Sequence, residues 1–432
     1  MRDLILTLFF ICALPWCFMR PYFGVLIWSW FGYMNPHRLA WGFAYHFPFV
    51  QITALTTLAG MVFSREPKRM PINGVTVVWL TWVAWMSLTT LFALNPDEAA
   101  PEWQRMIKIQ IMILVTLLVM YGRERIERLV WCIALSIGFF GIKGGIFTLL
   151  TGGQFRVWGP EGSFIEGNNE IALALLIIVP LMRYLQVVQT RRWVRIGLGV
   201  SMVLCVFSIV GSYSRGAFLG GAAMLVALWL RSRRKIVMAI PLVFVALAAL
   251  TFMPEKWAAR MESIEGYSAD GSAMGRINAW WFAYHVAEDH PFVGGGFDSF
   301  SPELFMRYAP NPTDFHDAHS IYFEVLGEHG FVGLALYLTL AVLVMLMGAR
   351  IIRQVRGRGE LKWAADLAAM LQVSFIGFAV SGAFLGLAYF DLPYHIMALM
   401  VLLHEHVKEA RASSPVTDPA ALAGRQSLLG RT

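Results

Sequence analysis

The densest group of polar side chains in this sequence lies directly before an apolar segment that begins near residue 320. The group is Asp314-Phe-His316-Asp317-Ala-His319-Ser320. A histidine placed there can act as a general base near neutral pH, because imidazole titrates in that range. Two carboxylates and two histidines this close could also bind a metal ion, but their spacing matches no standard zinc signature. A general base is therefore the favoured interpretation.

Two glutamates continue this polar pattern into the apolar segment. Glu324 and Glu328 are four residues apart, so both point along one face of a helix near its beginning. A carboxylate in the first turn of a helix is also stabilised by the helix dipole, which gives Glu324 a purely structural alternative.

Two arginines stand apart from the other basic residues. Arg215 lies in Gly211-Ser-Tyr-Ser-Arg-Gly216, a turn between two apolar segments, and an arginine at membrane depth usually marks a pathway or an anionic partner. An interfacial arginine that extends towards water is its structural alternative. Arg276 directly precedes a predicted short helix at residues 277–288, where a guanidinium and free backbone amides would suit a phosphate. Its alternative is a solvated loop arginine.

The composition is that of a membrane protein. Hydrophobic residues make up 57% of the 432 positions and charged residues 15%, whereas a soluble domain carries about a quarter charged residues. The apolar residues occur in long runs, as in membrane helices. The net charge of +7 comes from short loops between these runs, where orientation and lipid headgroups account for it. Nucleic acid is therefore not an expected partner, and membrane lipids are.

We predict an all-α integral membrane fold with about 12 transmembrane helices and a large periplasmic loop. Residues 3–36 are interrupted at Arg20-Pro21, so they form two short helices or one broken helix. The other apolar segments lie at about 45–63, 71–94, 109–122, 130–153, 171–187, 198–213, 217–230, 236–253, 320–349, 366–389 and 391–407. The predicted regions are an N-terminal membrane segment (1–44), transmembrane helices (45–253), the large loop with short helices (254–318), C-terminal transmembrane helices (319–407) and a disordered cytoplasmic tail (408–432).

The loops predict the orientation. Lys and Arg occupy 18 of the 36 residues in loops 64–70, 123–128, 191–195, 231–235 and 350–362, against 8 of the 99 in loops 95–108, 154–170, 214–216 and 254–318. The basic loops should be cytoplasmic. Both termini then lie inside if residues 3–36 cross once, and the polar cluster before residue 320 faces outward.

Three segments of this sequence, in their order along the chain, resemble motifs of the O-antigen ligase and polymerase superfamily, and the resemblance covers about residues 45–407. They are the Ser214-Arg215-Gly216 turn, the Pro291-Phe-Val-Gly294-Gly-Gly296 segment ending at Phe300, and the His319-Ser320…Glu328-x-Gly330-x-x-Gly333 run. The run Arg156-Val-Trp-Gly-Pro-Glu-Gly-Ser163, followed by Asn168-Asn169-Glu170, is similar to the exosortase A-associated branch of O-glycosylation ligases.

This resemblance implies an inverting, metal-independent glycosyltransferase of the C-type membrane class, without a cofactor. It would lie in the bacterial inner membrane with its active site facing the periplasm. Such a ligase takes a glycan from undecaprenyl diphosphate and passes it to a sugar of lipid A-core. Arg215 and Arg276 would hold the diphosphate, and His319 would take the proton from the acceptor hydroxyl. Candidate supporting residues are Ser214, Asp317, Ser320, Glu328, Asn168, Asn169 and Arg156.

The residues fit such chemistry. A diphosphate is a good leaving group, so two guanidinium groups can supply the charge that Mg²⁺ would otherwise bring. The sequence contains neither a Walker loop nor a Rossmann glycine fingerprint.

Several alternatives stay open. Within the enzyme class they are an O-antigen polymerase and a protein O-oligosaccharyltransferase. Outside the enzyme class, the alternatives are a lipid-linked sugar flippase and a transporter. Such proteins should carry ionisable residues near the middle of several helices. Here the charges gather at outer helix ends and in residues 254–318, which favours an enzyme. The acceptor, the glycan, the oligomeric state and the roles of His316 and Asp314 are not determined by the sequence.

Overall fold

The computed structural model describes residues 1–231 and 271–413, and all regular secondary structure in these residues is helical. The helices are α1 (Arg2–Met19), α2 (Pro21–Met34), α3 (Phe49–Phe63), α4 (Gly74–Leu91), α5 (Pro96–Val119), α6 (Gly122–Leu150), α7 (Asn168–Val188), α8 (Arg192–Gly211), α9 (Arg215–Arg231), α12 (Gly271–Asp289), α13 (Pro302–Tyr308), α14 (Ile321–Gln354), α15 (Lys362–Gly382) and α16 (Asp391–Ser413). Short 3₁₀ turns occur at Pro36–Leu39, Phe43–Tyr45 and Gly359–Leu361.

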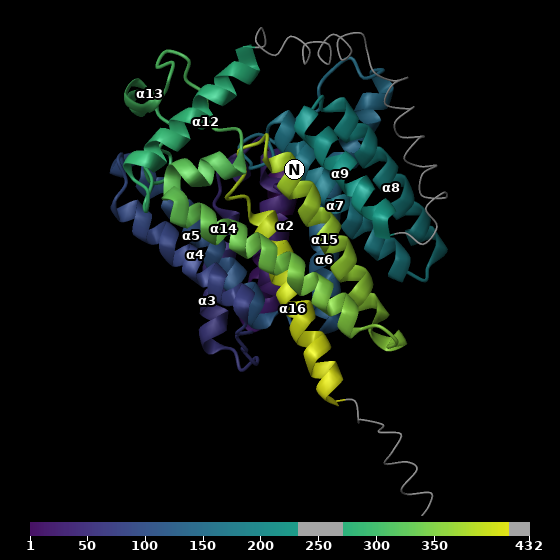
Figure 1. Ribbon diagram of the computed structural model, residues 1–432. Helices are drawn as coiled ribbons and strands as arrows, with labels where there is room; N and C mark the ends of the chain where they lie inside the picture. The colour runs from purple at the N-terminus through teal and green to yellow at the C-terminus, as the bar shows by residue number, and fades with distance from the viewer. Residues whose placement is uncertain (232–270, 414–432) are drawn as a thin grey trace, which may run out of the picture.

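The long helices pack side by side into one bundle, and α12 and α13 lie at one end of it (Figure 1). Among the described residues, seven helices are long and apolar enough to cross a membrane, namely α1, α4, α6, α7, α8, α14 and the segment Gly359–Gly382 that contains α15. The chain is thus a multi-pass membrane protein. The expectation of about twelve crossings remains a prediction for the other helices, and the predicted segment 236–253 lies outside the described residues.

Small residues let α6 and α8 approach closely. A Cβ atom at Gly145 would stand 2.2 Å from the carbonyl oxygen of Leu204, and one at Gly141 would stand 2.4 Å from the sulfur of Cys205. Close backbone approach through small side chains is how membrane helices gain packing energy, because lipid supplies no hydrophobic drive between them. These two glycines therefore fix the helix pair that ends at the Arg215 turn.

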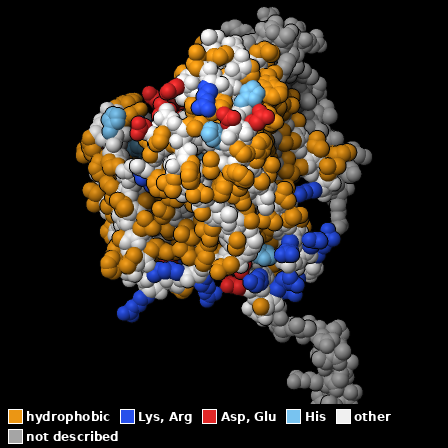
Figure 2. All heavy atoms as spheres, turned by 60° about the vertical axis from the view of Figure 1, so that its left-hand side comes forward, with side chains coloured by type: hydrophobic (Ala, Val, Ile, Leu, Met, Phe, Trp, Pro, Cys, Tyr) orange, Lys and Arg blue, Asp and Glu red, His pale blue; other side chains and the backbone are white. Residues whose placement is uncertain are grey.

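The basic loops converge at the end of the bundle opposite α12. Arg69 forms an ion pair with Glu409 at 3.1 Å, and Arg125 pairs with Glu66. The guanidinium of Arg123 lies over a tryptophan ring in the first turn of α15. Figure 2 shows Lys and Arg side chains along this end and an apolar band above it. The predicted asymmetry of Lys and Arg therefore has a counterpart in space, and we refer to this end as the basic end.

The interruption at Arg20-Pro21 separates two helices, α1 and α2, rather than bending one. The Arg2 guanidinium donates to the carbonyl of Leu39 at 3.1 Å, and the Asp3 carboxylate accepts from the backbone N–H of Gly42 at 3.1 Å. The N-terminus is thereby held at the end away from the basic end (Figure 1). The sequence placed both termini on one side of the membrane only if residues 3–36 cross it once. This condition is not met, because the start of α1 contacts the residues that follow α2.

Three predicted boundaries were wrong. Helix α5 begins at Pro96 rather than near residue 109, because a polar first turn of Asp97 and Glu98 precedes its apolar part. The segment predicted at 366–389 ends at Gly382, and a non-helical connection follows over residues 383–390. Helix α16 continues to Ser413, into the predicted tail.

Helices α12 and α13 have a small apolar core of their own. Phe282 and Phe305 stack with ring centroids 4.2 Å apart, and buried Ala279 and Val286 complete one side. A second stack, Trp280 on Phe323 at 4.9 Å, fastens this unit to the start of α14. Residues 271–318 of the predicted loop therefore form a packed unit, which we call the platform. Residues 254–270 of that loop lie outside the described residues.

Candidate active site

His319 lies directly before α14, as the sequence predicted, and its backbone is constrained. Its backbone has φ 42°, in the left-handed region that few non-glycine residues adopt. The indole N–H of Trp280 donates to the carbonyl of Ala318 at 2.8 Å, and the same ring stacks on Phe323. Contacts on both sides therefore hold the strained residue, and such strain is typical of functional sites.

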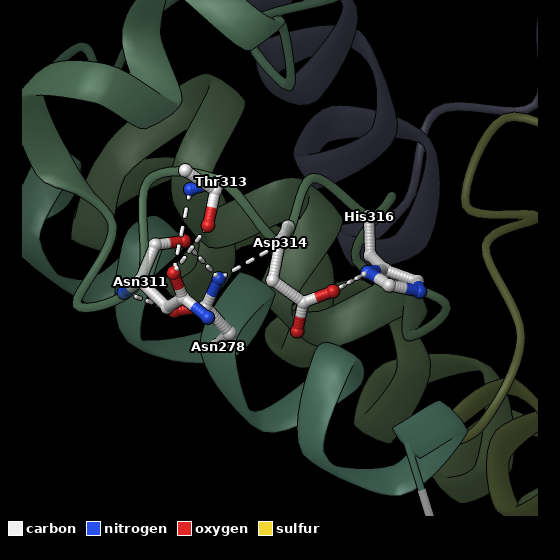
Figure 3. Close-up of polar contacts among 5 residues, drawn as sticks. All are labelled: Asn278, Asn311, Thr313, Asp314 and His316. Atoms are coloured by element: carbon white, nitrogen blue, oxygen red, sulfur yellow. Dashed lines mark hydrogen bonds and ion pairs between the residues drawn. The ribbon is translucent and has the colours of Figure 1, made fainter.

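The loop before His319 is held by one asparagine of α12 (Figure 3). The side-chain amide of Asn278 donates to the carbonyls of Asn311 and Asp314, at 2.8 and 2.9 Å. Its oxygen accepts from the backbone N–H of Asn311 at 2.8 Å. Asn278 is buried, so breaking these bonds would leave unpaired polar groups away from water. The platform thus sets the path of the chain towards His319.

His316 has a contact that suggests a structural role. Its Nδ1 lies 3.1 Å from a carboxylate oxygen of Asp314 (Figure 3). The ring also packs against Gly275, where a Cβ atom would stand 2.5 Å from the imidazole. His316 therefore fills the space beside the residue that precedes Arg276.

Arg276 lies inside α12, so the prediction that it precedes the helix was wrong. The helix begins at Gly271, and free amides of a helix start are not available at Arg276. The guanidinium nevertheless acts on His319. Burial is the main cause that lowers the pKa of His319 below its ordinary value, Arg276 lowers it further, and Asp317 opposes the shift. The lowered pKa favours the neutral form of the His319 imidazole, which is the form that can accept a proton.

Arg215 is the first residue of α9, so it follows the three-residue turn 212–214 rather than lying inside it. Ser214 caps the helix, because its hydroxyl accepts from the backbone N–H of Ala217 at 3.2 Å. Tyr213 adopts φ 59°, which reverses the chain between α8 and α9. Of the candidate supporting residues, Ser214 thus shapes the helix start that carries Arg215.

Two further supporting residues lie against this turn. Asn168 donates its side-chain amide to the carbonyl of Ser212 at 2.7 Å. Burial raises the pKa of Tyr213, and the positive charge of Arg156 opposes this shift, so Arg156 lies close to the same turn. Asn169 follows in the first turn of α7. The polar run that begins at Arg156 is therefore packed around the Arg215 turn.

The connection 383–390 lies between the Arg215 helix and His319. A Cβ atom at Gly216 would stand 3.5 Å from the Cβ of Phe384. One at Gly386 would stand 3.8 Å from the Cα of His319 and 3.5 Å from a carboxylate oxygen of Glu324. The structure therefore brings the two predicted sites to one end of the bundle, on either side of residues 384–386.

Glu324 and Glu328 share a helix face, as predicted, and both bond to this connection. Glu324 accepts from the backbone N–H of Ala388 at 3.1 Å. Glu328 accepts from the Tyr389 hydroxyl and, at 2.9 Å, from the backbone N–H of Asp298. Glu328 is only 5% exposed, so its carboxylate joins three segments rather than facing a substrate.

Tyr389 and Asp298 were missed by the sequence analysis. Tyr389 lay inside a segment predicted to be a membrane helix, and its only signal was the nearby glycine pair Gly382 and Gly386. Asp298 follows Gly296 in the glycine-rich segment and has φ 55°. Burial raises the pKa of Asp298, and the carboxylates of α5 raise it further. This segment therefore places a carboxyl group beside the polar start of α5.

The remaining polar residues of the predicted cluster differ in exposure. Asp317 is exposed, whereas Ser320 is buried directly before α14. Within residues 1–231 and 271–413, no three His, Cys, Asp or Glu side chains are placed to share a metal ion. The described site thus offers a half-buried imidazole with a lowered pKa beside a guanidinium, and a second guanidinium at the start of α9. Such a set can deprotonate a hydroxyl and neutralise an anion.

Two family models match the chain. Residues 1–190 match the model described as a family of unknown function (DUF5935). Residues 200–338 match the model described as O-Antigen ligase, and this range contains Arg215, Arg276 and His319. A comparison with curated proteins finds no match.

Proposed function

We infer from the match over residues 200–338 that this part of the chain belongs to the O-antigen ligase superfamily and has an activity of the ligase or polymerase type. On this premise we propose that the protein is an O-antigen ligase of the bacterial inner membrane. It transfers a glycan from undecaprenyl diphosphate to lipid A-core at the periplasmic face, with inversion and without a metal ion. The observation that carries the proposal is the half-buried imidazole of His319, held in a strained backbone position, with a pKa that burial and Arg276 lower.

His319 acts as the general base. Its imidazole takes the proton of an acceptor hydroxyl, and the oxygen attacks the anomeric carbon of the donor sugar. The bond between this carbon and the phosphate oxygen breaks on the opposite face, so the configuration inverts. The lipid diphosphate leaves with the electron pair of that bond. A lowered pKa keeps His319 ready to accept the proton at neutral pH.

Arg215 and Arg276 neutralise the leaving diphosphate. A planar guanidinium bonds two phosphate oxygens at once, which an ammonium does not. Arg215 starts a capped helix, so the positive end of the α9 dipole adds to its charge. Asp317 is exposed and raises the pKa of His319, so it favours the imidazolium formed during the reaction. The tight packing of the turn and platform supports a preorganised site.

The acceptor separates this proposal from its enzyme alternatives. Arg215 and His319 lie at one end of the membrane bundle, which suits two lipid-anchored substrates that meet in one plane. A polymerase would use two such lipids as well, and the run from Arg156 to Asn169 resembles ligases that glycosylate proteins. A flippase or transporter is disfavoured, because the predicted site residues gather at a helix end and in the platform.

Deleting the gene and analysing the lipopolysaccharide on a gel tests the proposal. Bare lipid A-core together with accumulated lipid-linked long chains is the result expected of a ligase. Single repeat units on the core would indicate a polymerase. Unchanged lipopolysaccharide with under-glycosylated surface proteins would indicate a protein acceptor. A purified ligation assay with lipid-linked glycan and lipid A-core then shows whether this protein alone performs the transfer.

A further inference from the structure

A groove crosses the outer surface of the bundle beside the Arg215 turn. It consists of two adjoining cavities of about 600 and 240 Å³, which share Leu39 and Lys143 in their linings. The larger cavity lies between α1, α2 and α6, and the smaller one lies between α6 and residues 156–160. We call the two together the Lys143 groove.

The groove carries positive charge along its length. Arg2 lines the larger cavity, Arg156 lines the smaller one, and Lys143 lies where they meet. Among the described residues, no Asp or Glu lines either cavity. The nearest acid along α1, Asp3, accepts from the backbone amides of Gly42 and Ala44 at 3.1 and 3.2 Å. The lining is therefore complementary to an anion.

Lys143 lies within α6, at some depth from the end of the bundle where this helix ends. It precedes the last residue of α6, Leu150, by seven positions, which corresponds to about 10 Å along a helix. A lysine at this depth is costly unless it reaches water or an anionic headgroup. Around it, Phe139 and Phe147 are each 40% exposed, so an apolar surface continues from the groove down α6. A headgroup in the groove could therefore keep its acyl chains in lipid.

The groove also adjoins the proposed catalytic site. The backbone N–H of Val157, next to Arg156, donates to the carbonyl of Gly211 at 3.0 Å. Gly211 is the last residue of α8, directly before the turn that leads to Arg215. A backbone hydrogen bond thus joins the groove wall to the Arg215 turn, so a lipid in the groove would lie next to a lipid held by Arg215.

We propose that the Lys143 groove binds the phosphorylated headgroup of the lipid acceptor. Lys143 and Arg156 contact its phosphate oxygens, and its acyl chains lie along α6. This inference rests on the proposed function, in which Arg215 and Arg276 are already assigned to the diphosphate of the donor. A second anionic lipid is bound most favourably by a second set of cations, and the groove provides one beside the first.

Binding of lipid A to the purified protein tests this inference without turnover. Native mass spectrometry would compare lipid A that carries its two phosphates with the same lipid after enzymatic dephosphorylation. We expect Lys143→Gln and Arg156→Gln each to weaken binding of the phosphorylated form about tenfold, as loss of a charge-assisted contact predicts. The dephosphorylated form should bind equally to wild type and variants. Lys143→Arg should retain most of the affinity.

A matched control lies at the basic end. Arg192 lines another groove with Arg183 and Arg195, of about 780 Å³, so Arg192→Gln removes an equivalent exposed charge there. It should leave lipid A binding unchanged. In the ligation assay, Lys143→Gln should raise KM for the acceptor but not for the donor.

Wild-type affinity in both glutamine variants would overturn the inference. Displacement of lipid A by equal amounts of phosphatidylglycerol would also overturn it, because the groove would then be a site for bulk phospholipid. A raised KM for the donor alone would assign the groove to the donor instead. If phosphorylated lipid A binds through Lys143 but wild type transfers no glycan to it, the proposed function fails while the binding site stands.

Discussion

Gly330 allows a test of how α14 positions the polar groups around His319. The helix breaks at this residue, with φ 68° and ψ −172°, a conformation that is almost restricted to glycine. A Cβ atom there would stand 2.6 Å from the carbonyl oxygen of Phe292 and 2.7 Å from that of Pro291. Gly330→Ala is therefore strained in its backbone and also collides with the glycine-rich segment.

The expected cost follows from these contacts. The backbone strain costs about 1–3 kcal/mol. Relief of the collision must move residues 291–296, which breaks the bonds Phe331 N–H to Pro291 O (2.9 Å) and Gly296 N–H to Glu328 O (2.8 Å). Each lost bond costs about 1 kcal/mol. We therefore expect Gly330→Ala to destabilise the protein by about 3–5 kcal/mol.

Two control variants separate the causes. Gly357 has φ 83°, but a Cβ atom there would have no neighbour within 4 Å, so Gly357→Ala carries strain without collision. Gly197 lies in a regular helix with nothing within 4 Å of the same position, so Gly197→Ala carries neither. In detergent, thermal unfolding followed by tryptophan fluorescence should rank the variants, from most to least stable, as Gly197→Ala, Gly357→Ala and Gly330→Ala.

The same series should be compared in the transfer assay. Gly330→Ala should lose most of its activity, because Glu328 and the connection 383–390 depend on the kink. The reasoning would be refuted if Gly330→Ala unfolded at the temperature of Gly197→Ala and kept wild-type turnover. A loss of activity without a loss of stability would refute the packing argument alone.

Four further predictions concern the chemistry. His319→Ala should reduce transfer about a hundredfold to ten-thousandfold with unchanged expression, whereas His46→Ala, an exposed histidine, should not. Arg215→Lys and Arg276→Lys should both be strongly impaired in turnover and in binding of lipid diphosphate, and normal values would make these arginines merely interfacial. Activity should rise with pH through a His319 pKa below its ordinary value, so Arg276→Gln should move this acidic limb to higher pH and Asp317→Asn to lower pH. Activity should survive EDTA, and loss that added divalent ion restores would contradict the metal-independent mechanism.

The local chemistry of several segments was readable from the sequence because it depends on neighbouring residues. Long apolar runs and the Arg20-Pro21 break predicted helices and their interruption, since a proline removes a helix hydrogen bond. The spacing of Glu324 and Glu328 predicted a shared face. The distribution of Lys and Arg predicted which loops share an end, because their charge keeps them out of the apolar band.

Boundaries and partners depended on contacts between distant segments. Arg276 was predicted to precede a helix at residues 277–288, yet α12 runs through both Gly275 and Arg276, and the His316 ring packs on the glycine. The connection 383–390 reads as apolar helix, and only tertiary structure shows that it bonds to Glu324 and Glu328.

The sequence by itself determined the class of protein, its helical segments and the residue types that could do chemistry, because hydropathy and side-chain chemistry are local properties. Tertiary structure decided which of these residues meet. In the fold, Glu328 is buried and accepts hydrogen bonds from the Tyr389 hydroxyl and the Asp298 backbone N–H. These bonds join segments that are far apart in the chain. Tertiary structure also left His319 half-buried beside Arg276, since the platform of α12 and α13 is fixed by aromatic stacking on α14.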